Sequence, residues 1–255
     1  NRDPDHIEKA FVFGGKGARD GLYSAFFAKS KMTSPPNPLT GERGLFACFA
    51  EDPEPNKLVD RLGDVFEIDN ASIKKWCVGS PIQSVLDALE TIISQHDLDP
   101  ASIEKISLTM PSDRIHIVDN AAMPTVCLQH LVALMILRGE CAFSAAHDES
   151  LMTNSEILQV RGKIEIIKSD VLVNAKPARQ SIVNIKLSSG RELKHHAKVV
   201  HGTPQRPMTK EDVARKATSI LGSVSSQDFS QLIDICLEHK KFSIKKLLKS
   251  CELVP

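Results

Sequence analysis

The sequence lacks the features that would indicate nucleic acid or a membrane as a partner. Its 32 basic and 32 acidic residues cancel, so no net positive charge attracts a polyanion. One Trp and one Tyr among 255 residues leave few rings on which nucleobases could stack. No apolar run approaches the roughly 20 residues that a membrane-spanning helix needs. We therefore expect no nucleic-acid partner and no membrane partner.

Regularly spaced cysteine pairs are also absent, and so is a charged-then-apolar signal peptide at the start. The six cysteines are scattered, at positions 48, 77, 127, 141, 236 and 251. This pattern argues against a disulfide framework and favours a reduced compartment. We expect the cytoplasm, or the mitochondrial matrix if the source is eukaryotic.

The clearest helix prediction is for the segment after Gly79. Ser80 is a preferred N-cap residue and Pro81 suits the first helical position. We predict an amphipathic helix that begins at Ser80 and ends before 97–100. Its apolar face has helical spacing and comprises Ile82, Val85, Leu86, Leu89, Ile92 and Ile93.

Strands and helices are segregated along the chain. Alternating apolar residues predict strands over 103–110 and 163–167 and a hairpin around Ser188-Ser189-Gly190. Helices are predicted over 18–32, 56–62, 124–137, 154–160, 210–221, 226–238 and 243–249. Helices at both ends and mixed elements between them indicate an α+β fold. We expect one helical domain built from residues 1–65 and 203–255, with a smaller α+β domain inserted at 66–202.

The stretch KKWCVGSPIQ (74–83) brings two lysines to the start of the predicted helix. We expect a short strand around Ile73, whose alternation would send one of Lys74 and Lys75 inward and the other outward. An inward lysine beside the unpaired N–H groups of a helix start would bind a carboxylate or a phosphate. The alternative is that both lysines are solvated and Ser80 only caps the helix.

Two other stretches suggest binding sites but fit no established motif. FGGKGARDG (13–21) matches neither GxxxxGK(S/T) nor GxGxxG, so we interpret its glycines as packing positions and Arg19–Asp20 as a solvated pair. Cys127 and His130 have the spacing of half a zinc site, but no second ligand pair appears and we expect no metal. We interpret His130 as a hydrogen-bonded core residue, and the histidines at 195, 196 and 201 as surface residues.

Four blocks in order resemble the MmgE/PrpD family, which includes 2-methylcitrate dehydratase, cis-aconitate decarboxylase and iminodisuccinate epimerase. They are KAFVFGGKGARDGLYSAFFA, LTGERGLFACFAED, IKKWCVGSPIQSVLDAL and GRELKHHAKVVHGTPQRPMTKEDVARKA. The resemblance implies a helical domain with an inserted α+β domain. It also implies a metal-independent lyase or isomerase that needs no cofactor, acts on small di- or tricarboxylates and forms a homodimer.

The resemblance also implies site residues. Lys74 matches the family's active-site lysine, and His130 is a second catalytic candidate because the family brings this helix towards the site. The expected substrate-binding residues are Lys75, Gly79, Ser80, Gln83, Asp119, Asn120 and Arg19.

The sequence also departs from the family in two ways. Gln83 stands where many members have a histidine, and an amide can only hydrogen-bond. The family's first half, with the aspartate and histidine region linked to proton transfer, has no counterpart in these residues. We expect a lyase of the 2-methylcitrate dehydratase type, truncated here and inactive as this chain alone. The alternatives are a decarboxylase, an epimerase, or a catalytically dead fragment that serves as a binding or dimerisation module.

Overall fold

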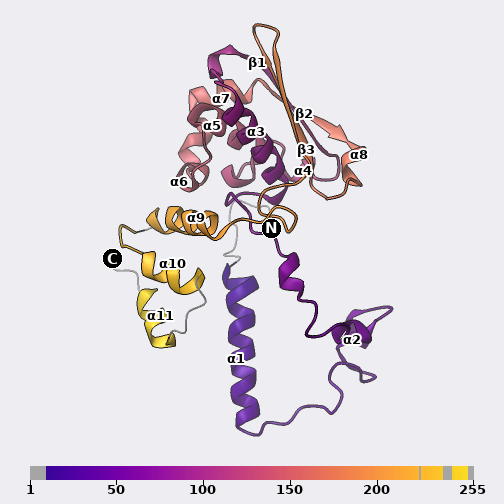
Figure 1. Ribbon diagram of the computed structural model, residues 1–255. Coiled ribbons are helices and arrows are strands. Elements are labelled where there is room, and N and C mark those ends of the chain that lie inside the picture. Colours follow the sequence, from indigo (N-terminus) through magenta and orange to yellow (C-terminus); the bar gives the residue numbers. More distant parts are fainter. Residues whose placement is uncertain (1–9, 224, 238–242, 252–255) are drawn as a thin grey trace. The chain divides into compact units, whose positions relative to one another are not determined.

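The structure is a computed structural model that describes residues 10–223, 225–237 and 243–251 (Figure 1). It divides into two compact units, Asn1–Asp69 and Asn70–Pro255, and each is described by itself. None of the described helices combines the length and the apolar character that crossing a bilayer requires.

The first unit consists of short helices joined by long loops. A π-helical turn at Ala10–Gly15 leads into α1 (Lys16–Lys29), and α2 (Leu45–Phe49) follows a loop rich in proline. This confirms the predicted helix near 18–32. The helix predicted over 56–62 is only a 3-10 turn, Pro55–Leu58, because the chain turns at Arg61 and Gly63, which both have positive φ.

A four-stranded mixed sheet organises the second unit, with the order β2-β1-β3-β4 (Figure 1). Its strands are β1 (Ile103–Pro111), β2 (Ile164–Ser169), β3 (Ser181–Leu187) and β4 (Glu192–Ala197). Strand β1 runs parallel to β2 and antiparallel to β3, and β3 and β4 form the predicted hairpin. The strands predicted over 103–110 and 163–167, the hairpin and the α+β class are confirmed.

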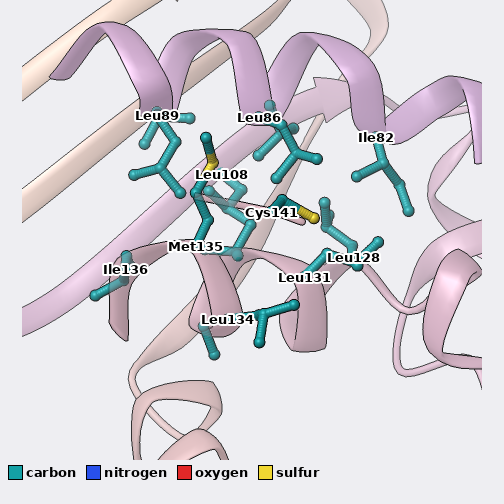
Figure 2. Close-up of a cluster of buried hydrophobic side chains, with 14 of the residues drawn as sticks. Ile82, Leu86, Leu89, Leu108, Leu128, Leu131, Leu134, Met135, Ile136 and Cys141 are labelled. Atoms are coloured by element: carbon teal, nitrogen blue, oxygen red, sulfur yellow. The ribbon is translucent and has the colours of Figure 1, made fainter. Parts of the chain in front are cut away.

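The core lies between the sheet and two helices, α3 (Gln83–Gln95) and α5 (Leu128–Arg138), which pack on each other. Figure 2 shows side chains of both helices filling the space between them, and Ile82, Leu86, Leu89, Leu128 and Leu131 are fully buried there. Burial of each such side chain stabilises the folded state by about 1.5–3 kcal/mol. The predicted apolar face of the helix after Gly79 is therefore confirmed.

The start of α3 differs from the prediction. Residues Ser80–Ile82 form a 3-10 turn, α3 begins at Gln83, and no side chain caps either element. The N–H groups of Ile82 and Gln83 bond to the carbonyls of Gly79 and Ser80. The prediction that Ser80 is the N-cap was wrong, because Gly79 takes the capping position and the tight turn closes these N–H groups internally. The strand predicted around Ile73 is also absent, since residues 71–79 have no regular structure.

The remaining helices connect these elements. The helix predicted over 124–137 is split at Cys127 into a 3-10 turn, Pro124–Val126, and α5. The helix predicted over 226–238 begins four residues later than predicted, at Ser230. Its last predicted residue, Glu238, lies outside the described residues. The expected division of the chain into a helical domain and an inserted α+β domain, with boundaries at 65/66 and 202/203, stays a prediction. The other helices are α4 (Ile115–Val118), α6 (Phe143–Ala146), α7 (Ser155–Arg161), α8 (Asp170–Val173), α9 (Lys210–Gly222), α10 (Ser230–Leu237) and α11 (Ile244–Ser250).

Candidate active site

A cavity of about 550 Å³ lies in the second unit where four chain segments meet. Residues 70–74 and the start of α3 form two of its walls, and the loops 176–179 and 200–205 form the others. Its volume is in the range of about 300–1,000 Å³ that is usual for small-molecule sites.

The charged side chains of this cavity are all basic. Lys74, Lys176 and Arg179 line it together with His201, and none of its lining residues is Asp or Glu. Cations gathered on the walls of a cleft create a positive potential that attracts carboxylates. Arg179 has a φ of +66°, an unfavourable left-handed conformation for an arginine, at the point where its loop meets the cavity.

Two of the walls are tied together through Gly202. The N–H group of Ile73 donates to the carbonyl of Gly202 at 2.8 Å. Gly202 has a φ of +93°, and a Cβ atom at this position would lie 1.9 Å from the carbonyl oxygen of Ile73. Only glycine lets the two backbones approach this closely.

An ion pair between the half-exposed Arg206 and the buried Asp87 fixes the 200–206 loop on α3. The Nη1 atom of Arg206 lies 2.9 and 3.2 Å from the two carboxylate oxygens of Asp87, whose side chain is 3% exposed. Burial raises the pKa of Asp87, and the charge of Arg206 opposes that shift. The backbone N–H of His201 also helps to lower the pKa of this carboxyl. The loop that carries His201 is therefore held by the ion pair of Arg206 and by the bond between Gly202 and Ile73.

The two lysines of KKWCVGSPIQ line different cavities. Lys74 lines the cavity, and its Nζ atom donates to the carbonyl of Val78 at 3.0 Å. Lys75 pairs with Glu90 at 2.5 Å, and its Nζ lies 5.0 Å from the centre of the Trp76 ring. Lys75 lines a different cavity of about 240 Å³. One lysine thus faces the candidate site, although no strand alternation places it there.

Ser80 and Gln83 also line the cavity. The amide of Gln83 is already used on both sides, because it donates to the carbonyl of Trp76 at 3.0 Å and accepts the N–H of Trp76 at 3.3 Å. Gln83 therefore shapes the wall. Gly79 does not line the cavity, and its N–H donates to the carbonyl of Thr125 at 2.8 Å.

A smaller cavity of about 180 Å³ adjoins the first around the start of α3. Ser80, Ser84 and Arg179 line both cavities. The smaller one adds apolar walls from β1 and α4 and one further guanidinium, that of Arg114. A ligand held by Lys74 and Arg179 can thus extend into a less polar pocket.

Asp119 and Asn120 belong to a separate polar cluster. Gln129 of α5 donates to Asp119 at 2.6 Å and accepts the backbone N–H of Asn120 at 2.9 Å, and Arg161 donates to the Asn120 side chain at 3.3 Å. Neither predicted residue lines the cationic cavity. The cluster fastens the turn after α4 to α5 and α7.

His130 is fully buried in α5, as predicted, but within the described residues neither ring nitrogen has a hydrogen-bond partner. The prediction of a hydrogen-bonded ring was therefore wrong. Burial, helped by the charges of Arg161 and Arg138, lowers its pKa to about 4. His130 does not line the cationic cavity, and no group of three potential metal ligands occurs among the described residues.

Arg19 lies in the first unit, where it pairs with Asp20 at 2.9 Å, and both side chains are half exposed. This matches the interpretation as a solvated pair.

Sequence reasoning missed Lys176, Arg179 and His201 as site residues. His201 was interpreted as a surface residue, yet its side chain is only 16% exposed and lies 3.4 Å from Asp212. The available signal was its place directly before GTPQRP, in a loop that follows a strand. Lys176 and Arg179 flank Pro177 in another loop, which gives no local sign of burial.

The chain is a mixed α+β protein, and the charged residues that line its 550 Å³ cavity are all basic. The family model of the MmgE/PrpD C-terminal domain matches residues 76–239, which is well over half of the chain. The chain belongs to the MmgE/PrpD family, as the four sequence blocks predicted. No curated protein matches the chain.

Proposed function

We propose that this chain forms the carboxylate-binding part of a metal-independent lyase of the 2-methylcitrate dehydratase type. The observation that carries the proposal is the cavity lined by Lys74, Lys176 and Arg179 without any carboxylate. Three cations suit a substrate with two or three carboxylates, and membership of the MmgE/PrpD family supports a dehydratase reaction.

The cations would act on the charge that develops during the reaction. When a proton leaves the carbon beside a carboxylate, negative charge spreads onto the carboxylate oxygens. Fixed positive groups that contact these oxygens stabilise the transition state, and one such donor is typically worth about 10²–10³ in kcat. Lys74 is the charge clamp in this proposal, since an ammonium offers three N–H donors. Backbone N–H groups contribute less to carboxylate binding than the sequence predicted, because the 3-10 turn at Ser80 bonds them internally.

Decarboxylase and epimerase chemistry would need the same carboxylate clamp. Gln83 bears on all three reactions in the same way, because an amide side chain cannot act as a general acid or base, and this one is held by the backbone of Trp76. The proton-transfer group must then be a residue other than Gln83. We also propose a homodimer, as in other members of the family.

The test compares two neighbouring lysines. Calorimetric titration with citrate, 2-methylcitrate and cis-aconitate would be done on the wild type, on Lys74→Met and on Lys75→Met. We expect Lys74→Met to weaken binding at least about tenfold, which corresponds to about 1.4 kcal/mol. Lys75→Met removes the same charge outside the cavity, so its affinity should stay within about threefold of the wild type.

A wild type that binds none of these acids would contradict the proposal. An equal loss of affinity in both variants would mean that only the general charge matters and that Lys74 is no clamp.

A further inference from the structure

The cationic cavity contains one side chain suited to proton transfer near neutral pH. Its other ionisable lining residues are two lysines and one arginine, and its lining includes no Asp, Glu, Cys or Tyr. The imidazole of His201 is the remaining acid–base group, and histidine is the residue that most often performs this role.

His201 is held from two sides. Its Nε2 atom lies 3.4 Å from Oδ2 of Asp212, and both side chains are largely buried, with exposed fractions of 16% and 23%. The loop that carries it is held on α3 by the ion pair between Arg206 and Asp87. Asp212 is fixed as well, because it also accepts the backbone N–H of Thr209 at 3.1 Å in the capping box of α9. Such a carboxylate can orient an imidazole and stabilise its protonated form.

We infer that His201 is the proton-transfer residue of this cavity and that Asp212 is its positioning residue. The inference rests on the proposed function. With Asp212 beside Nε2, the neutral ring carries its proton on Nε2 and accepts a second one at Nδ1.

The step balances without any further reactant. Nδ1 of His201 takes the proton from the carbon beside a substrate carboxylate, and the electron pair of that C–H bond forms the C=C bond. The C–O bond on the neighbouring carbon breaks and hydroxide leaves. The imidazolium then gives its proton to the hydroxide, so water departs and His201 returns to its neutral form.

The experiment follows the substrate C–H proton in D₂O by ¹H NMR. Protein and citrate are incubated together, and the loss of the methylene signal is measured, whether by exchange or by elimination. Binding is measured in parallel by calorimetry. The variant is His201→Gln, and the matched control is His195→Gln on β4, outside the cavity. Circular dichroism verifies folding, and His201→Asn is used if His201→Gln does not fold.

We expect His201→Gln to slow loss of the signal by about 10²–10⁴ while citrate affinity stays within about threefold. His195→Gln should behave as the wild type. Unchanged loss of the signal in His201→Gln would overturn the inference, and so would a wild type that binds citrate without any loss. A tenfold weaker affinity in His201→Gln would make His201 a binding residue and also overturn it. A wild type that binds no polycarboxylate would instead overturn the proposed function.

The role of Asp212 has its own readout, the tautomer of the His201 ring. In ¹⁵N-labelled wild-type protein, ¹⁵N–¹H spectra should show the Nε2–H tautomer, and Asp212→Asn should change its population. Thr209→Ala removes the other half of the capping box and should leave the tautomer unchanged. An Nδ1–H tautomer in the wild type, a measurement that needs no variant, would overturn the assignment.

Discussion

At the scale of single residues, burial and use in the cavity are separate properties. His130 is buried completely and lies outside the cavity, while His201 is partly exposed and lines it. An imidazole without hydrogen-bond partners in a core is costly to protonate. The environment of His130 therefore makes it a pH-sensitive element of stability, and this competes with the expectation that it is catalytic.

The pH dependence of stability tests His130. Its pKa in the folded protein is about 4, below the ordinary 6.5, so the unfolded chain binds the proton more strongly. This contribution destabilises the folded state as pH falls from about 6.5 towards 4, by about 2 kcal/mol at pH 5. Urea unfolding at pH 7 and pH 5 should show a smaller decrease for His130→Leu than for the wild type.

His116→Gln is the control for His130, because His116 lies exposed on α4 and its replacement should leave the decrease unchanged. Citrate affinity should be the same in His130→Leu as in the wild type. An unchanged pH dependence in that variant would show that folding does not lower the pKa of His130.

At the scale of elements, the cavity depends on two irregular segments that meet at one point. Residues 70–74 and the 200–206 loop are joined by the bond between Ile73 and Gly202. This contact brings Lys74 and His201 to the same cavity, although neither segment has regular structure of its own. Changing the contact should therefore affect binding as well as stability.

Gly202→Ala tests this contact. The added Cβ would lie 1.9 Å from the Ile73 carbonyl, and the left-handed φ is unfavourable for alanine. We expect a loss of about 2–4 kcal/mol in unfolding free energy and at least about tenfold weaker citrate binding. Gly190→Ala is the matched control, since Gly190 has a similar φ of +83° with nothing within 4 Å of the added carbon. It should cost only about 1 kcal/mol and leave binding unchanged. Equal binding by both variants would show that the contact does not shape the site.

The regular elements could be predicted because their signals are local. The spacing of Val85, Leu86 and Leu89 defines the buried face of α3, and alternation defines β1 and β3. The start of α3 could not be predicted as well. Both Gly79 and Ser80 can precede a helix. The N–H of Gly79 bonds to the carbonyl of Thr125, which is distant in sequence, so the local sequence alone does not decide between a side-chain cap and a 3-10 turn.

Only the candidate site residues that lie within a recognisable motif could be predicted from the sequence. Lys74 was found because the family's lysine stands in a recognisable block. Lys176 and Arg179 come from a loop about 100 residues later, and no local pattern relates them to Lys74. His201 depends on Asp212, whose sequence signal is that of a capping box. Residues brought together by loops leave little trace in local sequence.

At the scale of the whole molecule, the described part of the first unit exposes many large apolar side chains. Helix α1 has no buried side chain. Its exposed apolar residues include Leu22, Tyr23, Phe26 and Phe27. A helix of this length is marginal in water unless its apolar face is covered. The homodimer that we propose would provide such cover if α1 takes part in it.

Sedimentation of the wild type and of a Phe26→Ser/Phe27→Ser double variant tests this. We expect the wild type to be a dimer and the variant to be at least about tenfold weaker in association, because two aromatic rings leave the interface. Lys29→Ser is the control, since it changes the same helix at an exposed polar position. The cavity lies in the second unit, so citrate affinity should be equal in all three proteins. A monomeric wild type, or a variant that dimerises as well as the wild type, would show that α1 does not form the interface.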